Sequence, residues 1–350
     1  MSDAHTTTDA PQHEPLLDAD EDEGRRPTIL EQIAANGALR TLLILIAIVV
    51  VFSLLQFAEF ATVANLRNVA TDVSILLVLA VGMTFVITTA GIDLSVGSVL
   101  VFAGVIAGKV MMEVGGNNWG VIIVGLVAAL ISGTAWGILN GVLITKARVP
   151  PLIVTLGTLG MALGVSQVIT DGVDLRDVPF TLVDTIGTGK LLNQVPWLVV
   201  IAAVVAVVFG VVLATTRFGR HTYAIGSNVE AAQRAGINVD RHLIKVYALT
   251  GFLAGLAGFM SLARFSTTTI AGHSTDNLAA IAGTVLGGTS LFGGIGTIAG
   301  TVIGMFIPVV LQNGFIITGV KPFWQQVAVG AVLILAVYLD QLRRRTQYKA

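Results

Sequence analysis

Long apolar runs fill most of this sequence and limit what it can fold into. A helix needs about 20 mostly apolar residues to cross a hydrocarbon core roughly 30 Å thick. About ten runs approach or exceed that length, the eighth being short: 41–60, 68–90, 94–112, 119–145, 152–170, 195–216, 243–265, 278–291, 295–317 and 323–339. Because 54% of the residues are hydrophobic and only 12% are charged, the sequence predicts an all-α integral membrane protein with about ten transmembrane helices.

The apolar runs define a transmembrane domain, 40–342, between two polar tails. The N-terminal tail, 1–39, is acidic and too poor in apolar residues to fold alone, so we expect it to be disordered. We expect no secretory signal here, because the charged run of the tail is not followed by the apolar segment that such a signal needs. The C-terminal tail, 343–350, is basic, and a polar loop, 217–242, separates the sixth run from the seventh.

Lysine and arginine collect at the ends of some runs and predict the orientation in the membrane. Cytoplasmic loops carry an excess of these residues. They gather at four places: Arg25, Arg26 and Arg40; Lys146 and Arg148; Arg217, Arg220, Arg234, Arg241 and Lys245; and Arg343, Arg344 and Arg345. An even number of helices puts all four on one side, which makes both termini cytoplasmic and the loops 171–196 and 266–277 exoplasmic.

The residues that catalysis or metal binding requires are scarce. The chain has no cysteine, and its five histidines show no metal-ligand spacing. Ionisable residues within the apolar runs are few, and the sequence carries no basic stripe for nucleic acid. We therefore expect neither an enzyme nor a cofactor held by this chain. If the protein pumps a solute, the energy comes from a partner.

Two polar interruptions break the apolar pattern. "TTAGIDLSVGSVL", 88–100, contains Asp93, a strong intramembrane candidate for a functional site. Asp93 or Ser95 can equally cap the next helix by accepting a backbone N–H. "VLGGTSLFGGIG", 285–296, is a second, glycine-rich interruption. Paired interruptions of this kind are typical of transporters whose broken helices face the substrate path.

Glycines at four-residue spacing predict close helix packing. Gly251 and Gly255 form one such pair, and Gly296, Gly300 and Gly304 form a second series. In lipid, small residues allow two backbones to approach each other closely.

The stretch "GSNVEAAQRAG", 226–236, predicts a short helix within the polar loop. Ser227 and Glu230 have the spacing of a capping box, and Gly236 suits the C-terminal end of a helix. A helix of about two turns is marginal in water. It therefore needs a surface to dock on, either its own membrane helices or another protein.

"EAAQRAG" resembles the EAA loop of ABC importer permeases. Together with "RFGRHTYAIGSNVEAAQRAGIN", "GIDLSVGS" and "AIAGTVLGGTSLFGGIGTIAGTVIG", it makes the chain similar to the ribose-type sugar permease family from about residue 40 to 342. The resemblance implies broken or re-entrant membrane segments and import of a monosaccharide or small polyol. It also implies a bacterial cytoplasmic membrane, a second permease copy, an extracytoplasmic sugar-binding protein, and a cytoplasmic ATPase that holds ATP and Mg²⁺.

The resemblance and the residue chemistry assign three groups of candidate residues. For coupling to the ATPase we expect Arg217, Gly219, Arg220, Gly226, Ser227, Glu230, Ala231, Ala232 and Gly236. For the translocation path we expect polar side chains that can bond sugar hydroxyls, namely Asp93, Ser95, Ser98, Asn140 and Asn313. For docking of the binding protein we expect Asp171, Asp174, Arg176 and Asp177.

The chain departs from the family pattern at one place. Where the family has Gly-Tyr-Glu-Leu-Asp, this sequence has Thr-Asp-Asn-Leu-Ala at 275–279, so two acids of the pattern are missing. Three alternatives stay open: an ABC permease for a nucleoside or other furanosyl solute, an ion-coupled secondary transporter that uses Asp93, and a structural membrane scaffold.

Overall fold

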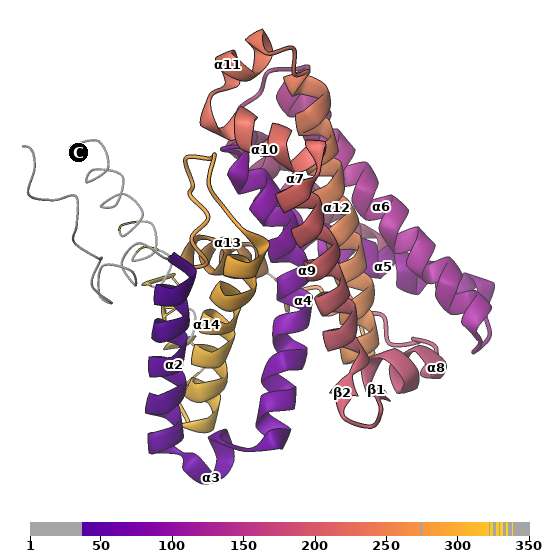
Figure 1. The fold of residues 1–350 in the computed structure, drawn as a ribbon. Helices are drawn as coiled ribbons and strands as arrows, with labels where there is room; N and C mark the ends of the chain where they lie inside the picture. The colour runs from indigo at the N-terminus through magenta and orange to yellow at the C-terminus, as the bar shows by residue number, and fades with distance from the viewer. Residues whose placement is uncertain are drawn as a thin grey trace, which may run out of the picture. The chain divides into compact units, whose positions relative to one another are not determined.

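The computed structural model describes residues 37–273 and 275–321, with scattered positions between 323 and 338. In this part of the chain eight helices are long and apolar enough to cross a membrane (Figure 1). They are α2 (Gly37–Leu55), α4 (Val63–Thr88), α5 (Val96–Val114), α6 (Trp119–Thr145), α7 (Pro151–Thr170), α9 (Trp197–Thr215), α12 (Val239–Phe265) and α14 (Ile298–Ile317). The predicted all-α membrane architecture is confirmed, and the chain is a multi-pass membrane protein.

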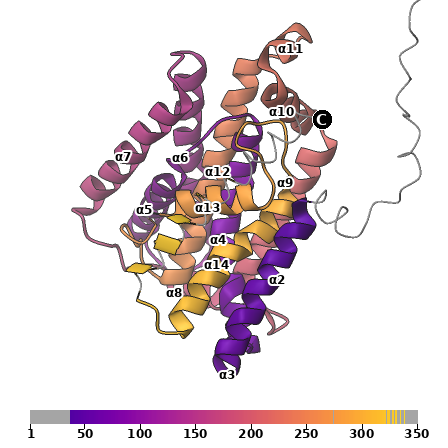
Figure 2. The ribbon, with the colours of Figure 1, turned by 90° about the vertical axis from the view of Figure 1, so that its left-hand side faces the viewer.

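Shorter elements connect these helices. They are α3 (Phe57–Phe60), α8 (Phe180–Leu182), the π-helix η1 (Val183–Gly187), the antiparallel strands β1 (Lys190–Leu191) and β2 (Val195–Pro196), α10 (Arg217–Ser227), α11 (Val229–Arg234) and α13 (Asp276–Leu286). Both views place α10 and α11 at one end of the helical bundle and α3 at the other (Figures 1 and 2). We call these the α11 end and the opposite end.

Two of the predicted runs are not continuous helices over their whole length. The first run is one helix that begins at Gly37, inside the expected tail, and it breaks at Gln56 before α3. The eighth is the short helix α13. Most of the tenth run, 323–339, lies outside the described residues, as do 1–36 and the C-terminal tail, 343–350.

Side-chain caps explain where several helices begin. Thr62 Oγ1 accepts the backbone N–H of Asn65, so α4 begins five residues before the predicted run. Asn238 Oδ1 accepts the N–H of Arg241 and starts α12 at Val239. These oxygens pair helix N–H groups that have no partner within the helix. Polar cap residues therefore extend both helices beyond their apolar runs.

α4 and α12 form the centre of the bundle. In their most apolar 18-residue windows, 83% of α4 and 78% of α12 is buried within the protein, compared with 11% of α2 and 28% of both α7 and α9. The central helices therefore face other helices, whereas the outer ones present apolar side chains such as Val168 and Val207 at the surface. Such a surface suits lipid.

Glycines bring the backbones of α6 and α12 into contact. A Cβ atom at Gly137 would lie 2.2 Å from the carbonyl oxygen of Tyr247, and one at Gly133 would lie 2.3 Å from that of Gly251. α13 and α14 meet in the same way, with Gly304 against the carbonyl of Gly283. The predicted glycine packing is confirmed for both helix pairs, although Gly296 precedes α14 and does not belong to it.

Gly137→Ala is expected to lower the thermal stability of the protein in detergent. The added methyl group would overlap backbone atoms, and such overpacking costs about 1–3 kcal/mol. Gly160→Ala on α7 is the matched control, because nothing lies within 4 Å of a Cβ there. Equal unfolding midpoints for the two variants in scanning fluorimetry would contradict the close contact between α6 and α12.

Candidate functional site

The helix α11 begins at a different cap from the one predicted. Ser227 is the last residue of α10, so the proposed capping box with Glu230 is wrong. Asn228 takes its place: its backbone is extended, with φ −161° and ψ 106°, and its Oδ1 accepts the N–H of Ala231 at 2.9 Å. An N-cap residue needs a non-helical backbone. Ser227 is helical and Asn228 is extended, so Asn228 is the cap.

The C-terminal end of α11 is the one predicted. Gly236 has φ +81°, a conformation that favours glycine. Its N–H donates to the carbonyl of Gln233, and the N–H of Ile237 donates to that of Ala232, which is the Schellman pattern. Both ends of this six-residue helix are therefore closed by their own hydrogen bonds.

One side of α11 rests on the protein and the other is open. Ala232 is buried in a small apolar cluster with Ile225 and Val239. Glu230 and Ala231 are exposed, as are Gln233, Arg234 and Gly236. The helix is thus anchored by one alanine and leaves a polar surface free for a partner.

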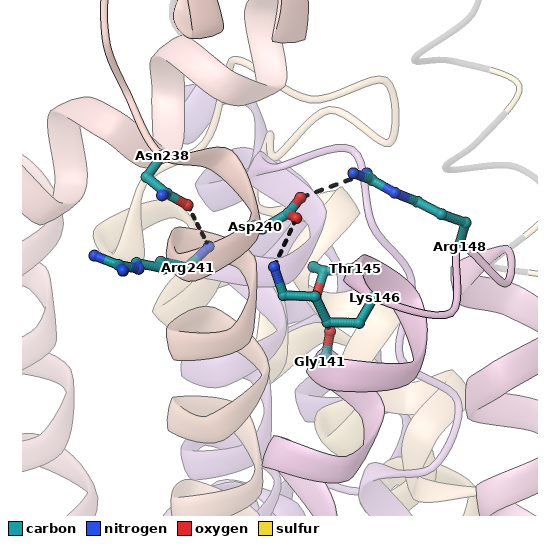
Figure 3. A network of polar contacts seen from close by, with 7 residues as sticks. All are labelled: Gly141, Thr145, Lys146, Arg148, Asn238, Asp240 and Arg241. Atoms are coloured by element: carbon teal, nitrogen blue, oxygen red, sulfur yellow. Dashed lines mark hydrogen bonds and ion pairs between the residues drawn. The ribbon is translucent and has the colours of Figure 1, made fainter.

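An ion-pair cluster next to α11 joins the first turn of α12 to the residues that follow α6 (Figure 3). The carboxylate of Asp240 pairs with Lys146 Nζ at 3.0 Å and with Arg148 Nη1 at 3.4 Å. Both cations are more than half exposed, and exposed pairs contribute roughly 0–1 kcal/mol. The cluster therefore contributes little to stability. It places one of the four predicted basic groups, Lys146 and Arg148, at the α11 end.

α10 connects α11 to both polar interruptions. The hydroxyl of Tyr223 donates to the carbonyl of Gly296 at 2.6 Å, and burial raises the pKa of this tyrosine, which keeps the hydroxyl protonated. A Cβ at Gly226 would lie 1.8 Å from the carbonyl oxygen of Thr88. That oxygen accepts the N–H of Gly294 at 2.9 Å. The end of α4, the glycine-rich interruption and α10 therefore meet at one point.

The other predicted coupling residues divide into structural and exposed positions. Gly219 is buried at the corner between α9 and α10, where a Cβ would lie 1.9 Å from the carbonyl oxygen of Leu213. Arg217 and Arg220 are exposed on α10, and Ser227 is exposed at its end.

Three predicted path residues form one buried network at the first interruption. Asp93 Oδ1 accepts the N–H of Ser95 at 2.9 Å and its hydroxyl at 2.6 Å. Asn140 Nδ2 donates to the same hydroxyl oxygen at 2.9 Å. Ser95 precedes α5 but its side chain makes no cap bond. Asp93 thus stabilises the turn through Ser95 and does not cap the first turn of α5.

The remaining two path residues lie apart from that network. Ser98 is buried on α5, one turn beyond Ser95. Asn313 on α14 pairs with Asn65 on α4, each amide donating to the oxygen of the other at 2.9 Å. The predicted path set is therefore divided between the first interruption and the contact between α4 and α14.

The predicted docking loop is tied to a second loop. Asp174 Oδ1 accepts the hydroxyl of Thr268 at 3.0 Å and the N–H of Ile270 at 2.7 Å. Asp171, Arg176 and Asp177 are exposed. Asp174 therefore has a structural bond to the segment that follows α12, whereas its neighbours are open to a partner.

Three contacts were missed by sequence reasoning. Asn277, where the family has a glutamate, donates through Nδ2 to the carbonyl of Leu94 at 3.0 Å. Tyr223 and Asp240 also make long-range contacts. The signal for Asp240 in the sequence is the charge of Lys146 and Arg148, which also indicates the orientation of the chain. Among the described residues, no group of three acids or histidines could hold a metal ion.

Comparison with known proteins agrees with this arrangement. The family described as "Branched-chain amino acid transport system / permease component" matches residues 65–337. The ribose import permease protein RbsC of Escherichia coli K12 is 39% identical over 326 residues, which cover 92% of this chain and 98% of that protein. No solved structure matches the chain.

Two further relatives are also sugar permeases of E. coli K12. The D-allose transport system permease protein AlsC is 34% identical over 86% of this chain and 91% of its own length. The galactose/methyl galactoside import permease protein MglC is 32% identical over 91% of this chain and 97% of its own.

The matched family and these relatives are permease components, so the chain is a transport subunit and not an enzyme. The chain belongs to the permease component family of the branched-chain amino acid transport system type.

Asn228→Ala is expected to destabilise α11, and Ser227→Ala is not. Loss of an N-cap oxygen costs about 0.5–2 kcal/mol. Hydrogen exchange of the amides of 229–235 measures the difference, with Asn228→Ala expected to exchange faster. Faster exchange in Ser227→Ala alone would instead support the capping box of Ser227 and Glu230 that the sequence predicts.

Proposed function

We propose that this chain is the membrane-spanning permease subunit of an ABC importer for a monosaccharide or small polyol. The observation that carries the proposal is α11, which bears the EAA residues, is capped at both ends and exposes Glu230 and Ala231. Its partner is the ATPase, which binds ATP and Mg²⁺. The relatives named for ribose, allose and galactose support the sugar class.

In this proposal α11 passes the motion of the ATPase to the membrane helices. When the ATPase dimer closes, it displaces α11 and, with it, α10. The bond from Tyr223 to Gly296 and the contact of Gly226 with Thr88 carry that displacement to both interruptions. The path then opens alternately to the two sides, because each partner favours one of two states.

The residues within the bundle favour a neutral solute. The family description refers to amino acids, which carry two charges and require paired charges at membrane depth. The buried network of Asp93, Ser95 and Asn140 offers hydrogen bonds and a single acid. A sugar needs only donors and acceptors. A nucleoside or other furanosyl solute has the same requirement, so the binding protein decides between them.

An ion-coupled mechanism has weaker support. It requires an acid that reaches the transported ion. Asp93 is 2% exposed and its Oδ1 accepts two bonds from Ser95, which indicates a role in holding the turn. A structural scaffold without transport does not explain why α11 is capped at both ends and has an exposed face.

The partners and orientation follow from the same proposal. The importer contains a second copy of the permease in a bacterial cytoplasmic membrane. Basic residues at the α11 end support a cytoplasmic position for this end and for both termini. The binding protein docks at the opposite end, where Asp171, Arg176 and Asp177 are exposed.

Mild-detergent purification of the tagged chain from its native host tests the proposal. Mass spectrometry should identify an ATPase with two nucleotide-binding domains and a sugar-binding protein, and the solute held by that protein names the substrate. Uptake that persists without any ATPase and collapses with ionophores would reject the importer and favour ion coupling.

Glu230→Arg is expected to abolish co-purification of the ATPase and solute uptake while membrane insertion stays normal. Reversal of an exposed charge at a docking helix opposes association through repulsion. Glu113→Arg is the control, since Glu113 is an exposed acid at the end of α5. Gly236→Ala should also reduce uptake because φ +81° is unfavourable for alanine. Full uptake in Glu230→Arg would contradict the coupling role.

Tyr223→Phe is expected to weaken coupling without releasing the ATPase. The variant keeps the ring and loses the bond to Gly296, a contribution of about 0.5–1.5 kcal/mol. The number of solute molecules imported per ATP hydrolysed, measured in proteoliposomes, should fall. An unchanged ratio would show that α10 does not act through this bond.

A further inference from the structure

A cavity of about 270 Å³ lies at the end of the bundle opposite α11. It is bounded by α4, by the last residue of α12, by Gly272, His273 and Asp276, and by α14. Small-molecule sites usually have volumes of about 300–1,000 Å³, so a cavity of this volume suits a ligand at the small end of that range. In the proposed orientation the cavity lies on the exoplasmic side.

Polar groups from three segments line one cavity. They are Asp72 on α4, His273 and Asp276 around the start of α13, and Gln312 and Asn313 on α14. Phe265 and aliphatic side chains supply the remaining wall. A mostly apolar wall with a few converging donors and acceptors is the usual form of a site for a small organic ligand.

The acids of this cavity are held by neighbours. Asp276 Oδ2 lies 2.6 Å from His273 Nδ1, and His273 Nε2 lies 2.7 Å from the hydroxyl of Ser261. Asp72 Oδ1 lies 3.4 Å from Arg264 Nη2. The second oxygen of each carboxylate is left to accept bonds from a ligand hydroxyl. Because Asp72 is paired with Arg264 and Asp276 is bonded to His273, the remaining carboxylate oxygens suit the hydroxyl groups of a neutral ligand.

The chain next to the cavity, outside the residues that line it, has unsatisfied polar groups. Arg264 Nε, Thr267 Oγ1 and Thr269 Oγ1 are buried, and none has a hydrogen-bond partner among the described residues. Each such group costs about 1–3 kcal/mol and calls for an explanation. Ser266 and Thr269 also have φ of +58° and +43°. Strain of this kind gathers at ligand clamps and switch regions.

We propose that this cavity is an exoplasmic binding site for a single neutral monosaccharide, occupied before the solute reaches the first interruption. The proposal rests on the proposed function. The carboxylates and amides bond the sugar hydroxyls, and Phe265 lies along the apolar side of the ring. Asn313 belongs to this site, which accounts for its distance from the network of Asp93, Ser95 and Asn140.

Cysteine protection tests this site directly, because the chain has no cysteine of its own. Gln312→Cys and Ile316→Cys place a thiol on two exposed positions of the cavity wall. Each variant, in the assembled transporter, is labelled with a membrane-impermeant maleimide with and without D-ribose, D-allose or D-galactose. Glu113→Cys, which does not line the cavity, is the control.

A sugar at ten times its dissociation constant leaves about one site in eleven empty, so labelling of both wall positions should slow about tenfold. Labelling of Glu113→Cys should not change. Unchanged labelling at both wall positions, while the same sugar is taken up, would overturn the site and leave the proposed function standing. Protection by a sugar that is never taken up would support the site and count against sugar import. If no sugar either protects or is taken up, both proposals fail.

Discussion

A bilayer offers no hydrogen-bond partner to backbone groups, so every place where this chain stops being helical inside the bundle must be satisfied by the protein itself. The carbonyl of Thr88, at the end of α4, accepts the N–H of Gly294. The carbonyl of Leu94, in the same interruption, accepts the amide of Asn277. These bonds cross from the first interruption to the second half of the chain. The bond from Gly294 to Thr88 therefore joins the two interruptions, and Asn277 ties the first one to α13.

α10 lies against both interruptions. α10 approaches the end of α4 only because Gly226 has no side chain, and Tyr223 holds it to the glycine-rich interruption. In the proposed mechanism, a displacement at α11 therefore reaches both interruptions at once. At the opposite end, Asp174 joins the exposed loop 171–177 to the segment after α12 that also borders the cavity. Each end of the bundle thus connects an exposed surface to a segment inside it.

Much of the fold could be predicted because apolar length directly reflects the thickness of the membrane. The run 119–145 coincides with α6, and other runs differ from their helices by a few residues where Thr62 or Asn238 provides a cap. The prediction failed at Ser227, because two adjacent polar residues can both serve as caps. Only the extent of α10 decides that Asn228 does so.

The sequence alone determined that this chain crosses the membrane many times, that polar segments interrupt its helices and that a short EAA helix lies among basic residues. Composition, periodicity and motif are local properties, and a local pattern is enough to establish them. Tertiary structure decided which polar residues meet. Asp93, Ser95 and Asn140 form one network, whereas Asn313 pairs with Asn65 and borders a cavity with His273 and Asp276. The physical reason is that these contacts join residues up to 248 positions apart, and only the packing of the helices brings such residues together.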